Sequence, residues 1–470
     1  MNRKTILTVL VVAALAALGP WPIPAIGQEQ YLVVAAGNDF SDAQAQAVLE
    51  AGGTMIKCLP KIGLAVATSA DLDFPAKAKG IAGISSVVPD PVAEADTDMQ
   101  LLSVESAEKV SKGIPKGANL VNLQWGLQAI KAPDTWALGV TGKGVRVAVI
   151  DAGIFTAHPD LAPNLNLALS KSFVPGETVE FIPGGPVMGN YSHATMVAGT
   201  IAAADNGFGT TGVAPDAEVV HIKVVSDQLF TSRVSWVIEA ILYAAEIHAD
   251  VANISMSFEW DKSDPDLSGR DVAQSVALRA VDYAYQQGTL VVASGGNYAT
   301  GYDGAGSYVR FPRDLPNVLG VAATAPQGCW ALEPTTDLDW PAPYTDYGQR
   351  VIDLAAPGGK FVGTPLDVVT LGELTLPACV FDMVVGPTTC FGPHGAPFEK
   401  QGTWSFASGT SFAAPHVAGV AALVIEANGH TLTPAQIRTI LQQSADDLGK
   451  PGNDDYYGLG RVNALRAVLQ

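Results

Sequence analysis

The heptapeptide VRVAVID (residues 145–151) is apolar at almost every position and ends in a carboxylate. A strand with one face in water alternates polar and apolar residues, whereas a strand of a parallel sheet, covered on both faces, is apolar throughout. Three later segments share this composition: EVVHIKVV (218–225), DVANISMS (250–257) and TLVVAS (289–294). They alternate with amphipathic segments of helical period: SRVSWVIEAILYAAEIHA (232–249) and RDVAQSVALRAVDYAYQQ (270–287). This alternation predicts an α/β fold, a mostly parallel, doubly wound sheet with helices on both faces.

The chain before this region follows a smaller pattern. Residues 31–89 read as a strand, a helix, a hairpin, a short helix and a final strand. This βαββαβ order predicts a small α+β domain of the ferredoxin-like kind. Residues 91–120 are polar and charged and have no sustained periodicity, which is typical of an exposed linker. We therefore expect a small domain over 28–90, a linker over 91–120 and a large domain over 121–470.

The first 27 residues have the composition of a targeting segment. Arg3 and Lys4 precede an apolar run from Ile6 to Leu18, and a proline-rich stretch with small residues follows up to Gly27. This order is typical of a secretory signal peptide (1–27) cut near Gly27. A membrane anchor is the alternative, but the apolar run is shorter than the roughly 20 residues that span a bilayer. The pattern predicts a secreted, extracellular protein with no membrane contact after signal cleavage.

Bulk composition excludes several classes of protein. The 470 residues are 48% apolar and 16% charged, which is typical of a globular protein with a large core. The net charge of -19 repels phosphate backbones, so nucleic acid is not an expected partner. The four cysteines are too few for a disulfide framework, and none has the CxxC spacing of a zinc or redox site. Cys379 and Cys390 flank one loop and form the favoured pair, while Cys329 is free or pairs elsewhere.

Polar side chains at strand ends are the first candidates for chemistry, because the crevice of an open parallel sheet lies beyond the carboxyl ends of its strands. Asp151 closes the strand 145–151, where partial desolvation means that it needs donors or a cation as partner. His193 opens a helix of small and apolar residues in YSHATMVAGTIAAA (191–204). Taken alone, each is more often structural, Asp151 in a cap or turn and His193 at a helix start. A catalytic role requires that both meet a nucleophile.

Ser411 stands where a glycine-rich turn meets a buried helix, in GTWSFASGTSFAAPHVAGVAAL (402–423). As a structural residue it would be the N-cap of that helix. As a nucleophile it has a neighbouring glycine for close substrate approach and helix N-terminal amides that face a developing oxyanion. Asn297 follows a buried strand and two glycines in VVASGGNYAT (291–300). Its amide is either a second oxyanion donor or part of a left-handed turn.

Four segments, in chain order, carry a resemblance to a known family: AVIDAGI (148–154), HATMVAG (193–199), ASGGN (293–297) and SGTSFAAPHVAG (408–419). They look like the signatures of the subtilisin-like serine proteases, which share this order of Asp, His, Asn and Ser. The resemblance covers residues 121–470, and residues 31–89 resemble the inhibitory propeptide that accompanies the family.

The resemblance implies a role for each candidate. Ser411 attacks the scissile carbonyl, His193 takes and returns the proton, and Asp151 fixes the tautomer of His193 and stabilises its imidazolium form. The amide of Ser411 and the side chain of Asn297 hold the oxyanion. The residue after the histidine, commonly glycine in the family, is Ala194 here, which is a modest change. No cofactor is implied for catalysis.

Substrate recognition in this family runs an extended peptide along two strand edges, here near KVVSDQL (223–229) and NISMSF (253–258). The implied substrate-binding residues lie at the ends of two predicted strands: Ser255, Met256, Ser257, Ser294, Gly295 and Gly296. Arg310 aligns near the base of the primary specificity pocket. Pointing inward, it would shorten the pocket or favour acidic side chains. Pointing outward, it would be a solvated surface charge.

Calcium is the ion that the resemblance implies. HPDL (158–161) and AADNGFGTTGVAP (203–215) resemble the family's calcium loop, and this hard cation prefers oxygen ligands. The implied ligands are the side chains of Asp160 and Asn206 and the carbonyls of Ala204, Phe208 and Thr210. A glycine-rich turn without metal is the alternative, because the expected N-terminal ligand near Val121 and Asn122 is not evident.

Together these features predict a secreted subtilisin-like serine endopeptidase, a monomer that hydrolyses polypeptides through an Asp-His-Ser triad and an acyl-enzyme. Its own propeptide is the expected intramolecular inhibitor, released by a cut within the linker 91–120. The segment from Pro357 to Gly402 is expected to form a surface excursion near Ser411. The rival is a catalytically inactive binding or scaffold protein that keeps the fold. An α/β-hydrolase esterase is disfavoured, because Ser411 lies in GTSFA rather than in a GxSxG elbow.

Overall fold

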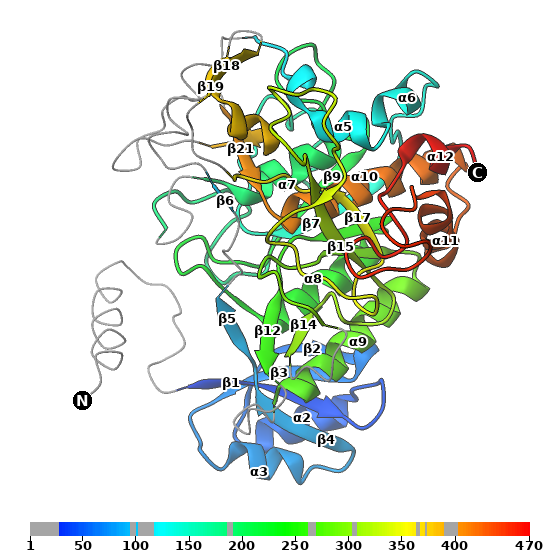
Figure 1. Ribbon diagram of the computed structural model, residues 1–470. Coiled ribbons are helices and arrows are strands. Elements are labelled where there is room, and N and C mark those ends of the chain that lie inside the picture. Colours follow the sequence, from blue (N-terminus) through cyan, green and yellow to red (C-terminus); the bar gives the residue numbers. More distant parts are fainter. Residues whose placement is uncertain are drawn as a thin grey trace.

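The computed structural model describes residues 28–94, 100–101, 117–185, 191–261, 269–302, 308–362, 367–371, 374–389 and 403–470. The predicted signal peptide (1–27) and most of the predicted linker (95–99 and 102–116) lie outside these ranges. Figure 1 shows a small N-terminal domain, in blue, packed at one end of a larger domain that is built on a central sheet.

The larger domain is built on an eight-stranded sheet with the order β16-β15-β13-β11-β7-β9-β8, in which β17 also pairs with β15. Its strands are β7 (Arg146–Asp151), β8 (Lys171–Ser172), β9 (Glu218–Lys223), β11 (Val251–Ile254), β13 (Leu290–Ser294), β15 (Val318–Ala325), β16 (Trp340–Pro341) and β17 (Leu354–Pro357). Only the pair of β15 and β16 is antiparallel within this sheet of described strands. The four apolar segments form β7, β9, β11 and β13, so the predicted parallel sheet is confirmed.

Helices cover both faces of the sheet. Successive side chains of a strand point to opposite faces, so the apolar side chains on each face need helices to cover them. The four main helices are α7 (His193–Ala202), α8 (Val234–Glu246), α9 (Arg270–Gln286) and α10 (Thr410–Ala427). Val147 and Val149 of β7 share a hydrophobic core with α7 and α10. Ala148 and Ile150 belong to a second core, on the other face, with α8 and α9. This burial of both faces is the predicted doubly wound arrangement.

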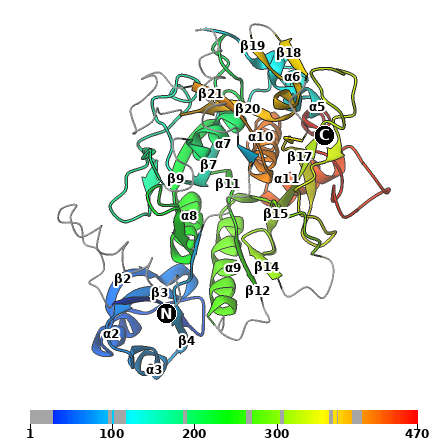
Figure 2. The ribbon, with the colours of Figure 1, turned by 60° about the vertical axis from the view of Figure 1, so that its left-hand side comes forward.

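The N-terminal domain is a four-stranded antiparallel sheet. Its elements are β1 (Glu29–Ala35), α2 (Asp42–Glu50), β2 (Thr54–Leu59), η1 (Pro60–Ile62), β3 (Leu64–Ser69), α3 (Phe74–Lys79) and β4 (Ile84–Pro89). The strand order β2-β3-β1-β4 agrees with the predicted ferredoxin-like pattern. Tyr31 and Val33 pack on the domain's own helices, whereas Leu32 and Val34 enter the core that holds α8 and α9. Figure 2 shows α8 and α9 side by side above this domain.

The chain after β4 stays in contact with the larger domain. β5 (Val92–Glu94) pairs antiparallel with β10 (Thr231–Arg233). β6 (Gln100–Leu101) pairs antiparallel with the end of β21 (Thr403–Ser408), the strand that leads to Ser411. The predicted linker therefore contributes one strand on each side of residues 95–99, and the second strand lies close to the candidate nucleophile.

Asp90, between β4 and β5, caps a helix of the larger domain. Its Oδ1 accepts a hydrogen bond from the Ser235 amide (3.1 Å), and its Oδ2 accepts one from the Ser235 hydroxyl (2.7 Å). Ser235 is the second residue of α8, and Arg233 at the N-cap position makes no side-chain cap of its own. Gln30 of β1 also donates to Asp90 Oδ2 (2.7 Å). The N-terminal domain thus satisfies donors of the first turn of α8.

Shorter elements complete the larger domain: η2 (Val121–Leu123), α5 (Trp125–Ala129), α6 (Ala132–Trp136), β12 (Phe258–Asp261), β14 (Tyr308–Phe311), β18 (Val368–Leu371), β19 (Leu374–Pro377), η4 (Ala378–Asp382), β20 (Val384–Thr388), α11 (Pro434–Ser444) and α12 (Ala464–Val468). By length and composition α10 could cross a membrane, but 89% of its apolar window is buried inside the protein. Its apolar character therefore serves the core.

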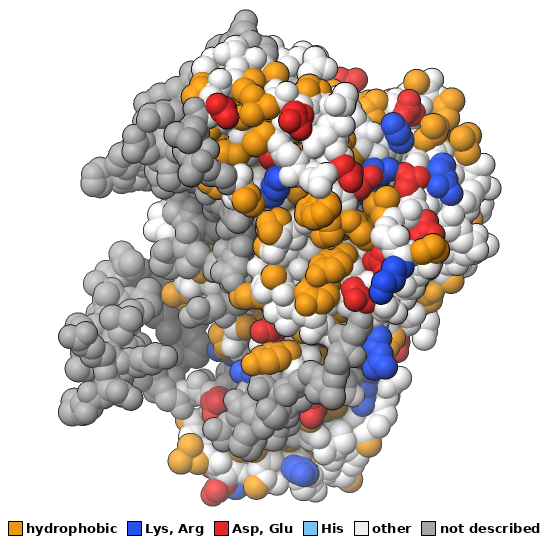
Figure 3. All heavy atoms as spheres, in the orientation of Figure 1, with side chains coloured by type: hydrophobic (Ala, Val, Ile, Leu, Met, Phe, Trp, Pro, Cys, Tyr) orange, Lys and Arg blue, Asp and Glu red, His pale blue; other side chains and the backbone are white. Residues whose placement is uncertain are grey.

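Charged side chains of both signs are interspersed over the described part of the face that Figure 3 shows, with apolar side chains between them. Such mixing keeps like charges apart. Acidic residues outnumber basic ones in the sequence, 46 to 27, but they do not form a single charged block. The mixed surface agrees with this distribution.

The described part of the segment from Pro357 to Gly402 is largely buried over residues 374–389, which is not the expected surface excursion, and residues 390–402 lie outside the described ranges. Phe381 of η4 meets Phe406 of β21 edge to face, with ring centroids 5.8 Å apart, inside a separate hydrophobic cluster. Cys379 is buried in η4 as a free thiol, and Cys390, its favoured partner, lies outside the described residues. The apolar side chains of η4 and β20 give this segment a core of its own, which explains the difference.

Candidate active site

Asp151 and His193 meet at the carboxyl end of β7. Asp151 is the last residue of that strand, and His193 is the first residue of α7, with Ser192 as its N-cap. The His193 Nδ1 lies 2.8 Å from Asp151 Oδ1 and 3.0 Å from Oδ2, and both side chains are buried. A carboxylate at Nδ1 holds a proton there and leaves Nε2 as a base. Nε2 has no hydrogen-bond partner among the described residues.

Ser411 is the second residue of α10 and not its N-cap, because Gly409 holds the cap position. Its hydroxyl donates to the Ser255 carbonyl (3.2 Å), and the Ser255 hydroxyl donates back to the Ser411 carbonyl (2.8 Å). The ring centroid of Phe412, the next residue, lies 5.6 Å from that of His193. The first turn of α10 therefore packs against the imidazole, while the Ser411 hydroxyl is engaged by Ser255 and not by His193.

Asn297 is fixed by the residue before Ser411. Its Oδ1 accepts hydrogen bonds from the Thr410 amide (2.8 Å) and the Thr410 hydroxyl (2.9 Å). The residue with positive φ in this turn is Gly296 (φ 107°), and not Asn297. Asn297 is therefore not the left-handed residue of the turn. Because Oδ1 is used as an acceptor, Nδ2 is the group of this amide that can donate to an oxyanion. The sequence interpretation missed Thr410, whose only signal was its place beside Ser411.

A buried ion cluster, also missed from the sequence, holds the loop that follows Asp151. Lys223 at the end of β9 is fully buried, 2.6 Å from Asp227 Oδ2 and 2.8 Å from Glu177 Oε2. Asp227 Oδ1 accepts the Gly153 amide (3.0 Å). Burial raises the pKa of Asp227, and the charge of Lys223 counteracts part of that shift. The available signal was a lysine inside an apolar run, which needs a buried counter-charge.

The six predicted substrate-binding residues lie at the carboxyl ends of β11 and β13, which are neighbours in the sheet. All six are buried: Ser255, Met256 and Ser257 follow β11, Ser294 closes β13, and Gly295 and Gly296 come next. Ser255 bonds Ser411, and Gly296 donates its amide to the Thr410 hydroxyl (3.0 Å). The two segments therefore both contact the turn that carries Ser411.

Arg310 points inward and is not a solvated surface charge, because its side chain is fully buried. Its Nη1 donates to the Ser257 hydroxyl (2.8 Å), its Nη2 lies 2.8 Å from Glu259 Oε2, and its Nε lies 3.0 Å from Asp346 Oδ2. A Cβ placed on Gly296 would lie 2.9 Å from the guanidinium carbon. Two carboxylates make this burial possible, and the pairing with Asp346 joins positions far apart in the chain.

Three of the predicted calcium ligands, Ala204, Asn206 and Thr210, bond to Asp160 or to the residue before it. Its Oδ2 accepts the Thr210 amide (2.9 Å), the Thr210 hydroxyl (2.8 Å) and the Trp404 indole N–H (2.7 Å). Its carbonyl accepts the Ala204 amide (2.7 Å), and the Asn206 side chain donates to the carbonyl of Pro159, the preceding residue (3.3 Å). Asp160 Oδ1 is buried and has no hydrogen-bond partner within the described ranges. An orphaned carboxylate oxygen of this kind requires a donor or a cation.

The same loop supplies few charges for a metal. Asn206 Oδ1 accepts the Phe208 amide (3.2 Å), so that oxygen is shared with the backbone. In the part of the chain that the structure describes, no group of three or more His, Cys, Asp or Glu side chains is placed to hold a metal ion. A cation at Asp160 would rely on one carboxylate, one amide oxygen and carbonyl oxygens, a set that fits calcium better than a transition metal.

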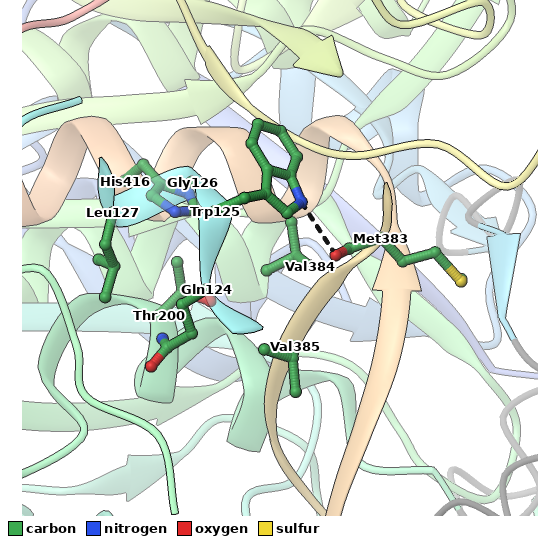
Figure 4. Close-up of a pocket in the computed structure, with 9 residues that line it drawn as sticks. All are labelled: Gln124, Trp125, Gly126, Leu127, Thr200, Met383, Val384, Val385 and His416. Carbon is green, nitrogen blue, oxygen red and sulfur yellow. Dashed lines mark hydrogen bonds between the residues drawn. The ribbon is translucent and has the colours of Figure 1, made fainter. Parts of the chain in front are cut away.

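A cavity of about 10 Å³ lies among α5, α7, β20 and α10 (Figure 4). Its lining residues are Gln124, Trp125, Gly126, Leu127, Thr200, Met383, Val384, Val385 and His416. The Trp125 indole donates to the Met383 carbonyl (3.2 Å), and His416 Nδ1 bonds the Phe412 carbonyl (2.7 Å). Burial lowers the pKa of His416 to about 4, so this imidazole is neutral at pH 7. The volume suits about one water molecule, so the cavity is a packing void and not the substrate site.

Comparison with known proteins assigns the family. Residues 142–460 match the subtilase family, and this range contains Asp151, His193, Asn297 and Ser411. The chain is 33% identical over 347 residues to subtilisin NAT of Bacillus subtilis subsp. natto, which covers 74% of this chain and 71% of that protein. Subtilisin Savinase of Lederbergia lenta is 32% identical over 347 residues, which covers 74% of this chain and 99% of that one.

Solved structures share the fold. Fervidolysin from Fervidobacterium pennivorans, described as a keratinolytic enzyme related to subtilisin, has a TM-score of 0.68 at 24% identity and covers 94% of this chain and 61% of its own. The epidermin leader peptide processing protease EpiP of Staphylococcus aureus has a TM-score of 0.69 at 21% identity. The match covers 94% of this chain and 98% of that one. Residues 121–470 are only three quarters of the chain, so both likenesses extend into the N-terminal domain. The chain belongs to the subtilase family of serine endopeptidases.

Proposed function

We propose that this endopeptidase cleaves polypeptides through a triad of Asp151, His193 and Ser411 and an acyl-enzyme intermediate. The observation that carries the proposal is the buried Asp151–His193 pair at the carboxyl end of β7. The carboxylate lies 2.8 Å from Nδ1, and Nε2 has no competing partner among the described residues. The imidazole packs against the helical turn that carries Ser411.

The reaction begins when the Ser411 hydroxyl leaves the Ser255 carbonyl and turns to His193 Nε2 by rotation about its Cα–Cβ bond. His193 takes the proton as Ser411 Oγ bonds to the scissile carbonyl carbon. Asp151 stabilises the resulting imidazolium, which then gives its proton to the leaving amine. The acyl group stays on Ser411 as an ester. A water molecule, activated by His193, hydrolyses this ester and restores the serine.

Asn297 and the start of α10 are proposed to stabilise the oxyanion. α10 is an 18-residue helix, and Ser411 lies in its first turn, where the positive end of the helix dipole and free amides are found. Thr410 holds Asn297 Oδ1, so Nδ2 is the donor that faces a developing charge. A donor that is already positioned needs no reorganisation during the reaction.

The N-terminal domain (28–90) is proposed to be an intramolecular inhibitor and folding aid, released by a cut within 91–120. Three contacts support this role: the apolar interface with α8 and α9, the Asp90 cap on α8, and the pairing of β6 with residues 407–408 beside Ser411. A large parallel sheet has many sequence-distant contacts and folds slowly, so a docked partner lowers the barrier. Residues 1–27 are proposed to direct secretion.

A structural calcium ion is proposed at Asp160, with Asn206 and carbonyl oxygens of the 203–210 loop as further ligands. The support is the orphaned Asp160 Oδ1 and the gathering of these residues around it. When bound, the ion supplies positive charge that fixes the loop, and it takes no part in the chemistry of Ser411.

A fluorophosphonate probe tests the triad directly, because it labels only an activated serine. Purified protein is expected to carry the label on the peptide that contains Ser411. The Ser411→Ala chain is expected to stay unlabelled and uncut in the linker. Ser444→Ala, which removes a buried hydroxyl on α11, is the matched control and should label as the parent does. Self-cleavage by the Ser411→Ala chain would overturn the assignment, and an unlabelled parent that cleaves no peptide would favour the inactive scaffold.

A further inference from the structure

We propose that Arg310 closes the floor of the primary specificity pocket and restricts cleavage to bonds preceded by a short side chain, such as that of glycine, alanine or serine. This inference rests on the proposed function, because it names the substrate class of the same site. It follows from where the two pocket segments lie, how the guanidinium is held and how its charge is compensated.

The pocket is defined by two segments that flank Ser411. Ser255 exchanges two hydrogen bonds with Ser411, and Asn297, directly after Gly296, accepts two from Thr410. A scissile carbonyl bound at Ser411, with its oxygen toward Asn297, therefore places the preceding side chain between the segments 255–257 and 294–296. The depth of the space between these segments decides which side chains fit.

The Arg310 guanidinium occupies that space. β14 pairs with β12 so that Arg310 lies opposite Glu259. From there Nη1 reaches the Ser257 hydroxyl at 2.8 Å. On the other side, a Cβ placed on Gly296 would lie 2.1 Å from Asp346 Oδ2 and 2.9 Å from Arg310 Nη1, so the Arg310–Asp346 pair packs directly against that glycine. Ser257 and Gly296 belong to opposite segments, so a long substrate side chain cannot pass between them while Arg310 stays in place.

Several contacts keep Arg310 in place. Its Nε donates to the Tyr302 hydroxyl (2.8 Å), and its guanidinium carbon lies 4.4 Å from the centroid of the Tyr298 ring. Asp346, which is fully buried, depends on Arg310 for its nearest counter-charge (3.0 Å), whereas Arg313 is 3.8 Å away. Withdrawing Arg310 would leave a buried carboxylate poorly compensated, which is costly. The floor is therefore rigid.

The charge of Arg310 does not make the pocket selective for acidic side chains. Two carboxylates, those of Glu259 and Asp346, already lie within 3.0 Å of the guanidinium. A substrate carboxylate would meet a compensated cation and the negative charge of Glu259. The guanidinium acts on the substrate through its volume, and a short uncharged side chain is the one that fits.

The test uses peptide p-nitroanilides that differ only in the residue before the scissile bond: alanine, leucine, phenylalanine or glutamate. The wild-type enzyme is expected to cleave the alanine substrate with kcat/KM at least about 10-fold above the phenylalanine and glutamate substrates. A preference for phenylalanine, leucine or glutamate would overturn the inference. Fluorophosphonate labelling of Ser411 in the same preparation separates the two hypotheses, because a labelled enzyme with the wrong preference contradicts only the role of Arg310.

A double variant, Arg310→Gly with Asp346→Asn, opens the floor without leaving a buried unpaired carboxylate. The amide oxygen of the introduced asparagine can still accept the backbone amides of Tyr298 and Thr300, as Asp346 Oδ1 does now (3.0 and 2.9 Å). The ratio of kcat/KM for phenylalanine over alanine is expected to rise about 100-fold. An unchanged ratio in the folded variant would overturn the inference.

A second double variant, Arg310→Met with Asp346→Asn, separates the effect of the Arg310 side-chain volume from that of its charge. It also tests the inference if the glycine variant does not fold. It keeps a long side chain and removes the positive charge, so the phenylalanine to alanine ratio should stay within about threefold of wild type. A large rise in kcat/KM for the glutamate or phenylalanine substrate, relative to the alanine substrate, would contradict a steric floor. The matched control is Arg438→Ala with Asp353→Asn, which removes an ion pair between α11 and the residue before β17 and should leave all ratios unchanged.

Discussion

The two halves of the site differ in how their polar groups are paired. The proposed catalytic half, Asp151 and His193, leaves Nε2 without a partner among the described residues. The proposed recognition half, Arg310 with Glu259 and Asp346, holds its guanidinium by several hydrogen bonds and ion pairs. A group that moves protons must be free to change partners, whereas a group that sets the shape of a pocket must not move. Asp151, His193 and Arg310 are all buried, so pairing and not exposure distinguishes the halves.

The largest effect should come from the catalytic half. Asp151→Asn puts an amide where a carboxylate is needed, which favours the tautomer of His193 that cannot accept the Ser411 proton. We expect kcat to fall about 10,000-fold, the loss typical of serine proteases with this change. Steady-state kinetics with the four p-nitroanilides measures it. The preference among substrates should be unchanged, and a changed preference would show that the two halves are not independent.

Asn297 lies where the halves meet and should give an intermediate effect. Asn297→Ala removes the proposed oxyanion donor and leaves Thr410 without its acceptor. We expect kcat to fall about 100- to 1,000-fold with little change in KM, as is typical for loss of one oxyanion donor. Asn297→Asp is the informative control, because it keeps the acceptor for Thr410 and loses the donor. If the aspartate variant keeps wild-type kcat, Asn297 is only a structural residue.

Calcium removal should affect stability and leave both halves intact. Chelation with EGTA is expected to lower the Tm by about 5 °C, since a ligand present at 100 times its Kd stabilises by about 2.7 kcal/mol. Adding calcium should restore the Tm and adding magnesium should not, because magnesium demands a smaller octahedral site. The preference among p-nitroanilides should not change. A Tm that is insensitive to EGTA would mean that Asp160 holds no calcium.

The smallest effect concerns His221, a fully buried histidine in β9 near Asp151 and Lys223. Burial lowers its pKa to about 4, with the charge of Asp151 opposing the shift in part. Between pH 6.5 and 4 the unfolded chain binds a proton that the folded chain does not, so stability falls as the pH falls through this window. At pH 5 the loss relative to pH 7.5 is about 2 kcal/mol for this residue.

Urea unfolding at these two pH values compares the parent with His221→Gln. The variant should lose about 2 kcal/mol less than the parent on acidification. His158 and His416, whose pKa values burial also lowers to about 4, remain in both proteins and set the shared background. An equal loss in both proteins would show that His221 is already protonated or that it does not titrate in this range.

Local patterns predicted most of the fold. A buried strand is recognisable from its own residues, because they form a short apolar run. The segments of β7, β9, β11 and β13 could therefore be predicted from the sequence, as could the βαββαβ order of the first domain. Motif order also singled out Asp151 and His193, which the structure brings into contact, while their catalytic roles stay predictions.

The remaining features depend on partners that are distant in the chain. Arg310 is buried because Asp346, 36 positions later, compensates it, and no local pattern shows that pairing. Lys223 likewise needs Glu177, which precedes it by 46 positions. Ser411 is the second residue of α10, because Gly409, two positions earlier, holds the N-cap position. Tertiary contacts, and not propensity, decide such positions.

Asp90 shows what the loss of the first domain would mean for the rest of the molecule. It gives α8 a cap that the larger domain does not make for itself. If residues 28–90 leave as proposed, the first turn of α8 would lose this cap, and its amides would be left to water. The mature enzyme would then stay folded because its unfolding is slow. A molecule that did unfold would have no N-terminal domain to guide its refolding.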